Sequence, residues 1–118
     1  MSRTVTGWKA FRGPDEEGRW DGKSLHFLFH GHGGSRLVPM DRWLHAKARR
    51  VRDGRGRWYR SGFHFLERVE DALAFDRLTK GKYVFFLVEA RRTRPKPRSR
   101  AGIRLAQDIK VLSGTMMQ

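Results

Sequence analysis

The sequence contains no cysteine and few acidic residues, with 12 Asp and Glu against 26 Lys and Arg. Without cysteine the chain can form neither a disulfide framework nor a thiolate metal site, and this composition suits a reducing compartment. No apolar run approaches the ~20 residues that a membrane-spanning helix needs. Residues 1–11 also hold no apolar run of signal-peptide length. These absences predict a soluble cytoplasmic protein that does not bind membranes.

The apolar residues that are present suffice for one core. Hydrophobic residues make up 38% of the chain and aromatic residues 12%, including four tryptophans and eight phenylalanines. This content is too high for a disordered chain, despite the high charge. The length of 118 residues fits one domain with one hydrophobic core.

The formal net charge is +14, and 19 of the 26 basic residues are arginine. Self-repulsion at this charge disfavours the compact state, and a bound polyanion would relieve it. Arginine carries a planar fork of donors that grips phosphate and stacks on bases. A compositional bias towards arginine is the alternative explanation of that preference, but it does not explain the net charge.

Periodicity and turn signals predict seven elements in the order β–β–α–β–α–β–β. The strands are predicted over residues 5–11, 25–30, 58–66, 82–90 and 105–112. Helices are predicted over residues 39–51 and 67–78, the second with acids in its first turn and Arg77 in its last. The order predicts an α+β fold, a small single domain with a mainly antiparallel sheet and two helices.

Residues 91–104 are predicted to form a long basic loop between the last two strands. Pro95 and Pro97 disfavour a regular ladder and favour an extended path. Such an arm could follow a phosphate backbone or enter a groove. A solvated loop without a partner is the alternative. The single domain is predicted over residues 1–113, with a flexible tail at 114–118.

Positive charge concentrates in residues 42–60 and 91–104, which together hold 15 of the 26 basic residues and one acid, Asp53. This segregation predicts a basic surface that binds DNA or RNA. No helix-turn-helix, zinc-finger or RNP motif is present, so the prediction is contact with the phosphate backbone rather than sequence readout. The predicted contact residues are Arg49, Arg50, Arg52, Arg55, Arg57, Arg60, Arg91, Arg92, Arg94, Lys96, Arg98, Arg100 and Arg104.

Trp58 and Tyr59 lie within the first basic segment. Adjacent strand residues point to opposite faces, so one of the two should pack inward and the other could stack on a base. Packing of both is the alternative.

Other chemistry is weakly indicated. His30 and His32 share a strand face and could bind zinc if His64 or an acid joined them, but a plain glycine turn explains HGHGG better. The same glycines could form an anion nest. Ser61 and His64 are close in sequence but lack a nucleophile elbow. We therefore predict no catalytic residue, no metal ion and no cofactor.

Five segments spread over most of the chain form a further pattern: GWKAF, PMDRWLHA, WYRSGFHFLERVEDAL, YVFFLVEARR and LAQDIKVL. Together they resemble a group of small bacteriophage-encoded accessory proteins of poorly characterised function. The resemblance implies a viral protein in the cytoplasm of a host cell that acts on nucleic-acid machinery or on a defence system. It transfers no catalytic residue.

The GFHF and EDA portion is also weakly similar to ADP-ribosyltransferase-like folds. That likeness implies that Arg12 or His64 could hold a dinucleotide and that Glu89 could be catalytic. The chain departs from the pattern because it has no E-x-E or Q-x-E pair. The sequence thus predicts a non-enzymatic nucleic-acid-binding protein. The alternatives are an inhibitor that docks on an acidic host protein and a transferase.

Overall fold

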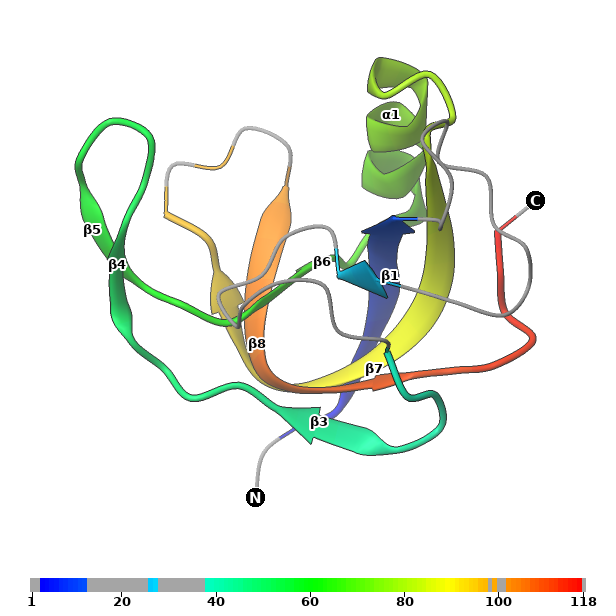
Figure 1. The fold of residues 1–118 in the computed structure, drawn as a ribbon, viewed down its shortest axis with the longest axis horizontal. Helices are drawn as coiled ribbons and strands as arrows, with labels where there is room; N and C mark the ends of the chain where they lie inside the picture. The colour runs from blue at the N-terminus through cyan, green and yellow to red at the C-terminus, as the bar shows by residue number, and fades with distance from the viewer. Residues whose placement is uncertain (1–2, 13–25, 28–37, 98, 100–101, 118) are drawn as a thin grey trace.

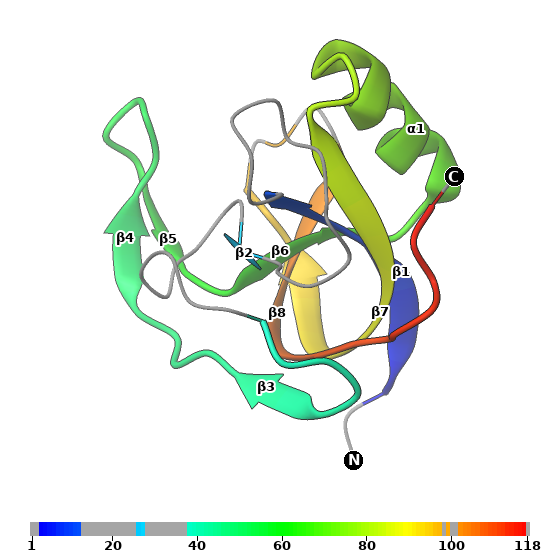
Figure 2. The same cartoon turned by 45° about the vertical axis from the view of Figure 1, so that its right-hand side comes forward.

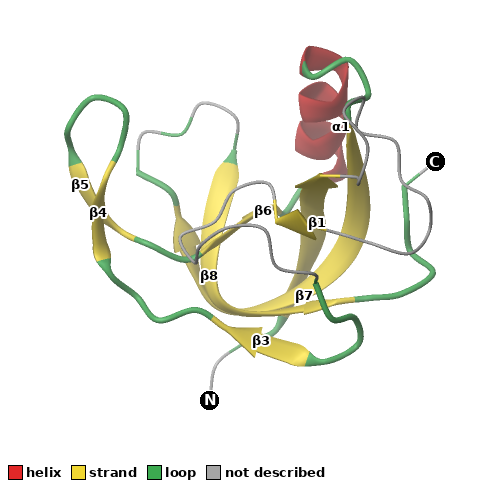
Figure 3. Cartoon of the chain, in the orientation of Figure 1, coloured by secondary structure: helices red, strands yellow, loops and turns green. Residues whose placement is uncertain are grey.

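A computed structural model describes residues 3–12, 26–27, 38–97, 99 and 102–117. This part of the chain is mostly β, with one short helix (Figures 1 and 3). The elements are β1 (Val5–Arg12), β2 (His26–Phe27), β3 (Trp43–His45), β4 (Arg50–Arg52), β5 (Trp58–Arg60), β6 (Phe63–Leu66), α1 (Val69–Leu78), β7 (Tyr83–Pro95) and β8 (Ile103–Val111).

Four antiparallel strands close into a small barrel. β7 pairs with β1 along the whole of β1 and with β8 on its other side. β6 pairs with the first half of β8 and returns to β1 through Trp8 and Leu66, which closes the ring. The second half of β8 carries β3 as an additional strand. β7 and β8 are long and strongly bent, as closure of so few strands requires (Figure 1).

Two apolar clusters hold the barrel together. The larger cluster includes Phe11, Phe65, Phe86 and Ile109, all at most 2% exposed. The smaller cluster forms where α1 packs on the barrel through Ala72, against neighbours such as Phe85. Successive residues in the first part of β7 therefore bury apolar side chains on both faces of the strand, which explains the continuous apolar run over residues 83–88.

The predicted α+β class with two helices was wrong, because the described chain is mostly β, with a closed barrel and one short helix. The segment predicted as a helix over residues 39–51 contains β3 and the start of β4 instead. Leu44, Ala46 and Ala48 alternate with polar residues, which is a strand pattern, while Leu44 and Ala48 also have the four-residue spacing of one helix face. The free edge of β8 decides between the two, since Leu44 pairs there with Ile109. Tertiary pairing thus overrides the local helical preference.

The predicted basic loop over residues 91–104 was also wrong in its extent. β7 continues to Pro95 and β8 begins at Ile103, so most of the predicted loop belongs to a β-hairpin. Pro95 is the last residue of β7, opposite Arg104, where the missing amide donor costs little. The actual connection spans residues 96–102, of which 98, 100 and 101 lie outside the described residues.

Most of the other elements agree with the sequence. The strands at residues 5–11, 82–90 and 105–112 and the helix at 67–78 are confirmed within a few residues. The strand predicted over 58–66 is divided into β5 and β6, and only residues 26–27 of the strand predicted over 25–30 are described.

Residues 115–117, which the sequence assigns to a flexible tail, run along β7. The Met117 N–H donates to the Phe85 carbonyl at 2.9 Å, and the Leu87 N–H donates to Thr115 Oγ1 at 3.1 Å. The described part of the chain contains no helix that is long and apolar enough to cross a bilayer.

Candidate nucleic-acid interface

β4 and β5 form a two-stranded ribbon that projects from the barrel on the side away from α1 (Figures 1 and 2). Its register pairs Arg50 with Arg60 and Arg52 with Trp58. Directly opposed residues and residues two apart share a face of a β-ribbon. One face, called the ribbon face below, therefore carries Arg50, Arg52, Trp58 and Arg60.

The ribbon face presents a tryptophan among arginines. Trp58 is 48% exposed, and the guanidinium carbons of Arg50 and Arg52 lie 4.8 Å and 4.6 Å from its ring centroid. An open hollow lies beside the ring and is lined by Arg50, Trp58, Tyr59 and Arg60. Among the described residues, no carboxylate lies within 4.0 Å of the three arginines. The contacts that the structure gives the side chains of Arg50 and Arg52 are therefore with the indole.

Tyr59 lies on the opposite face of the ribbon, together with Val51. Both side chains are half-buried, and the Lys96 ammonium lies 5.4 Å from the Tyr59 ring centroid. Burial, followed by the Asp53 charge, raises the pKa of Tyr59. Of the two predicted stacking candidates, Trp58 is thus the one on the more exposed face.

The turn of the ribbon is held by Asp53. Its carboxylate accepts the N–H groups of Arg55 at 2.8 Å and Arg57 at 3.0 Å, and it lies 3.3 Å from Arg57 Nε. These contacts, led by the backbone hydrogen bond from Arg57, lower the pKa of Asp53. Arg57 is therefore neutralised within the turn, whereas Arg55 stays exposed.

A second open groove lies between the tip of the ribbon and the connection from β7 to β8. It is lined by Asp53, Gly54, Arg55, Arg57, Lys96, Pro97 and Ser99. The fold thus brings parts of the two basic segments together, although they are separated in sequence. Arg98 and Arg100 belong to the same connection but lie outside the described residues. Arg49 precedes β4 and is exposed.

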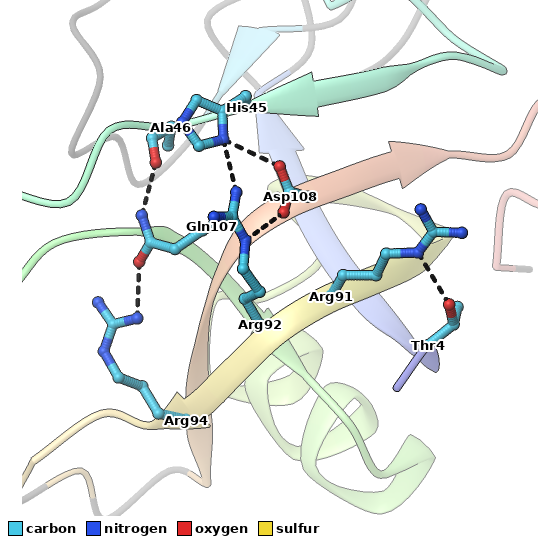
Figure 4. Close-up of polar contacts among 8 residues, drawn as sticks. All are labelled: Thr4, His45, Ala46, Arg91, Arg92, Arg94, Gln107 and Asp108. Atoms are coloured by element: carbon cyan, nitrogen blue, oxygen red, sulfur yellow. Dashed lines mark hydrogen bonds and ion pairs between the residues drawn. The ribbon is translucent and has the colours of Figure 1, made fainter. Parts of the chain in front are cut away.

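Arg94 fastens the ribbon to the barrel. Its guanidinium donates to Gln107 Oε1 at 2.6 Å and to the carbonyls of Arg60 and Ser61, each at 2.8 Å. Gln107 in turn donates from Nε2 to the Ala46 carbonyl at 2.5 Å (Figure 4). Burial, followed by the Arg60 charge, lowers the pKa of Arg94. We therefore assign Arg94 to the structure rather than to phosphate contact.

Arg92 is bound on the outer side of the barrel. Its Nε lies 2.7 Å from Asp108 Oδ2, and Nη2 lies 2.9 Å from His45 Nδ1, which is itself 2.9 Å from Asp108 Oδ1 (Figure 4). Burial would raise the pKa of Asp108, but the hydrogen bonds from Arg92 and His45 outweigh it and lower that pKa.

Arg91 and Arg104 also have partners within the chain. The Arg91 Nε donates to Thr4 Oγ1 at 3.0 Å, and its guanidinium carbon lies 4.1 Å from the Trp43 ring centroid. Arg104 Nε lies 3.3 Å from Glu67 Oε2. Of the predicted contact residues that the structure describes, acceptors within the chain bind the side chains of Arg57, Arg91, Arg92, Arg94 and Arg104. No such acceptor among the described residues is bound by the side chains of Arg49, Arg50, Arg52, Arg55, Arg60 and Lys96.

Sequence reasoning missed Lys9, which is 1% exposed. Its ammonium donates to the His64 carbonyl at 2.7 Å, and burial lowers its pKa to about 7. The alternation within β1 could have indicated that Lys9 points inward, because Lys9 shares a strand face with buried Phe11. The sequence does not show which face of this strand points inward, because Trp8 and Ala10 make the other face apolar as well.

Arg12 and Glu89, two residues of the transferase alternative, are not brought together. Arg12 pairs with Tyr83 and Glu89 pairs with Thr6, so the two lie six residues apart along β7, about 20 Å in an extended strand. Glu89 is instead 3.5 Å from Lys110. Within the described ranges, no three His, Asp or Glu side chains form a metal site, and His30 and His32 fall outside those ranges.

The described chain is thus a small antiparallel β-barrel that carries a projecting basic ribbon with an exposed tryptophan. Neither a protein-family model, nor a curated protein, nor a solved structure matches it.

Proposed function

We propose that the chain is a non-enzymatic nucleic-acid-binding accessory protein that contacts the phosphate backbone mainly through the ribbon. The observation that carries the proposal is the ribbon face, where the guanidinium groups of Arg50, Arg52 and Arg60 have no carboxylate partner among the described residues. A net charge of +14 adds a long-range attraction for polyanions.

The groove at the ribbon tip extends this surface. Arg55 and Lys96 border it from two separate segments, and neither side chain lies within 4.0 Å of a described carboxylate. A phosphate backbone that crosses the ribbon face could continue past this groove. Arg57, Arg92, Arg94 and Arg104 are not proposed as phosphate contacts, because acceptors of the chain already bind their guanidinium groups.

The test compares two triple variants that remove the same charge. The first is Arg50→Gln, Arg52→Gln, Arg60→Gln. The control is Arg12→Gln, Arg68→Gln, Arg77→Gln, all exposed and outside the ribbon. Binding of labelled DNA and RNA oligonucleotides is measured by fluorescence anisotropy at several salt concentrations. Loss of three phosphate contacts should reduce the slope of log K against log salt by about 2 to 3 units, depending on the strand form.

The control triple should keep nearly the wild-type slope. Equal effects of the two triples would contradict a ribbon-centred interface, and a flat salt response of the unmodified protein would contradict nucleic-acid binding itself. In the latter case, docking on an acidic host protein would be the next proposal. The bacteriophage resemblance stays a prediction.

A further inference from the structure

The ribbon face combines features that suit an unpaired nucleotide. Trp58 is 48% exposed, and the adjacent hollow is lined by Trp58, Tyr59 and two arginines. Base stacking on an aromatic side chain needs a base whose π-face is accessible. In an intact duplex those faces are covered by neighbouring base pairs, whereas a single strand exposes them.

The two arginines beside Trp58 strengthen this fit. Their guanidinium carbons lie over the indole, 4.6 Å and 4.8 Å from the ring centroid, so a stacked base would take the place that a guanidinium group occupies in the free protein. Guanidinium planes can themselves stack on a base and can bind the phosphate that follows it. Arg60 lies on the same face, opposite Arg50, and adds a third cation at the margin.

We infer that the protein binds single-stranded nucleic acid in preference to duplex, with one base stacked on Trp58 and the flanking phosphates bound by Arg50, Arg52 and Arg60. This inference rests on the proposed function and specifies the strand form it recognises. A basic β-ribbon can also enter the major groove of duplex DNA. The exposed indole favours the single strand, because a phosphate contact alone needs no aromatic surface.

The experiment uses the full chain and three labelled probes. The probes are a 15-nucleotide thymidine oligomer, a 15-unit abasic oligomer with the same phosphates, and a hairpin duplex closed by a loop too short to present unpaired bases. Each is titrated by anisotropy with wild type, Trp58→Ala and Trp58→Phe. Leu78→Ala is the matched control, because Leu78 is also an exposed apolar side chain, 79% exposed on α1.

Wild type should bind the thymidine oligomer more tightly than the abasic oligomer and the duplex. Trp58→Ala should weaken binding of the thymidine oligomer by about 5- to 150-fold, as expected for the loss of one stacked base, and should leave abasic binding almost unchanged. Trp58→Phe should retain part of the affinity and Leu78→Ala all of it. Thermal unfolding of each variant verifies that the fold is intact.

Two results would overturn the inference while leaving the proposed function in place. One is salt-dependent binding in which the duplex is bound as tightly as the thymidine oligomer. The other is an equal effect of Trp58→Ala on the thymidine and abasic probes, including no effect on either. Absence of salt-dependent binding to all three probes would instead reject the proposed function, and the inference with it.

Discussion

At the scale of single residues, the buried Lys9 is the most unusual feature of the barrel. It is 1% exposed and shares an inward strand face with Phe11. Burial disfavours its charged form and lowers its pKa from 10.5 to about 7. The residue therefore makes the stability of the fold depend on pH in a range where few other side chains titrate.

The sign of this dependence follows from proton linkage. Between pH 7 and 10 the unfolded chain holds a proton on Lys9 that the folded chain has released, so stability should rise with pH in this window. As the pH rises, we expect the unfolding free energy of wild type to increase relative to that of Lys9→Met, by at most about 1.4 kcal/mol per pH unit. Urea unfolding at pH 7, 8 and 9 measures it. Parallel curves for the two proteins would show that Lys9 keeps a normal pKa.

At the scale of elements, polar contacts attach the β4–β5 ribbon to the barrel. Arg94 of β7 donates to the carbonyls of Arg60 and Ser61 at the end of β5, and Gln107 of β8 binds both Arg94 and the Ala46 carbonyl. These contacts span the base of the ribbon. The orientation of the ribbon face thus depends on a network of polar side chains as well as on apolar packing.

Arg94→Gln should separate the structural role of this arginine from phosphate contact. The substitution leaves the carbonyls of Arg60 and Ser61 and the amide oxygen of Gln107 without their charged donor, which should lower stability by about 1–3 kcal/mol. Nucleic-acid affinity should fall because the ribbon is less well oriented, while the salt slope should stay close to that of wild type. Arg55→Gln, at the exposed turn, should do the opposite, reducing the slope with little effect on stability.

Denaturant unfolding and salt-dependent anisotropy measure the two quantities. A reduced slope with unchanged stability in Arg94→Gln would identify Arg94 as a phosphate contact and would contradict its assignment to the ribbon base.

At the scale of the whole molecule, some of the surplus arginines form ion pairs within the chain, whereas others have no carboxylate partner among the described residues. Asp53, Glu67 and Asp108 neutralise arginines at the turn and on the barrel. The ribbon face lacks such partners among the described residues. Repulsion among its cations opposes folding, so an anion bound there should stabilise the native state.

Tripolyphosphate at millimolar concentration should therefore raise the melting temperature more than sodium chloride of equal ionic strength. The shift should be largely lost in Arg50→Gln, Arg52→Gln, Arg60→Gln and retained in Arg12→Gln, Arg68→Gln, Arg77→Gln. Differential scanning fluorimetry provides the measurement. Equal shifts in both triples would mean that the anion responds to diffuse charge rather than to the ribbon.

The sequence predicts those parts whose physical signal is local. The first part of β7, residues 83–88, is aromatic or β-branched at every position but Leu87, which indicates a central strand, and α1 carries charges that match its dipole. The segment over residues 39–51 carries helical and strand periodicities together, so local signals could not decide between them. Only the free edge of β8 selects the strand at β3.

The surplus of arginine, the two basic segments and the tryptophan within the first of them can be read before any folding is considered, because they are properties of composition and residue order. Tertiary structure alone decided which cations stay available, because Arg92, Arg94 and Arg104 meet partners that are distant in sequence. Closure of the barrel is also a tertiary property. The pairing of β7, β8 and β6 sets where the ribbon leaves the barrel and where Lys9 is buried.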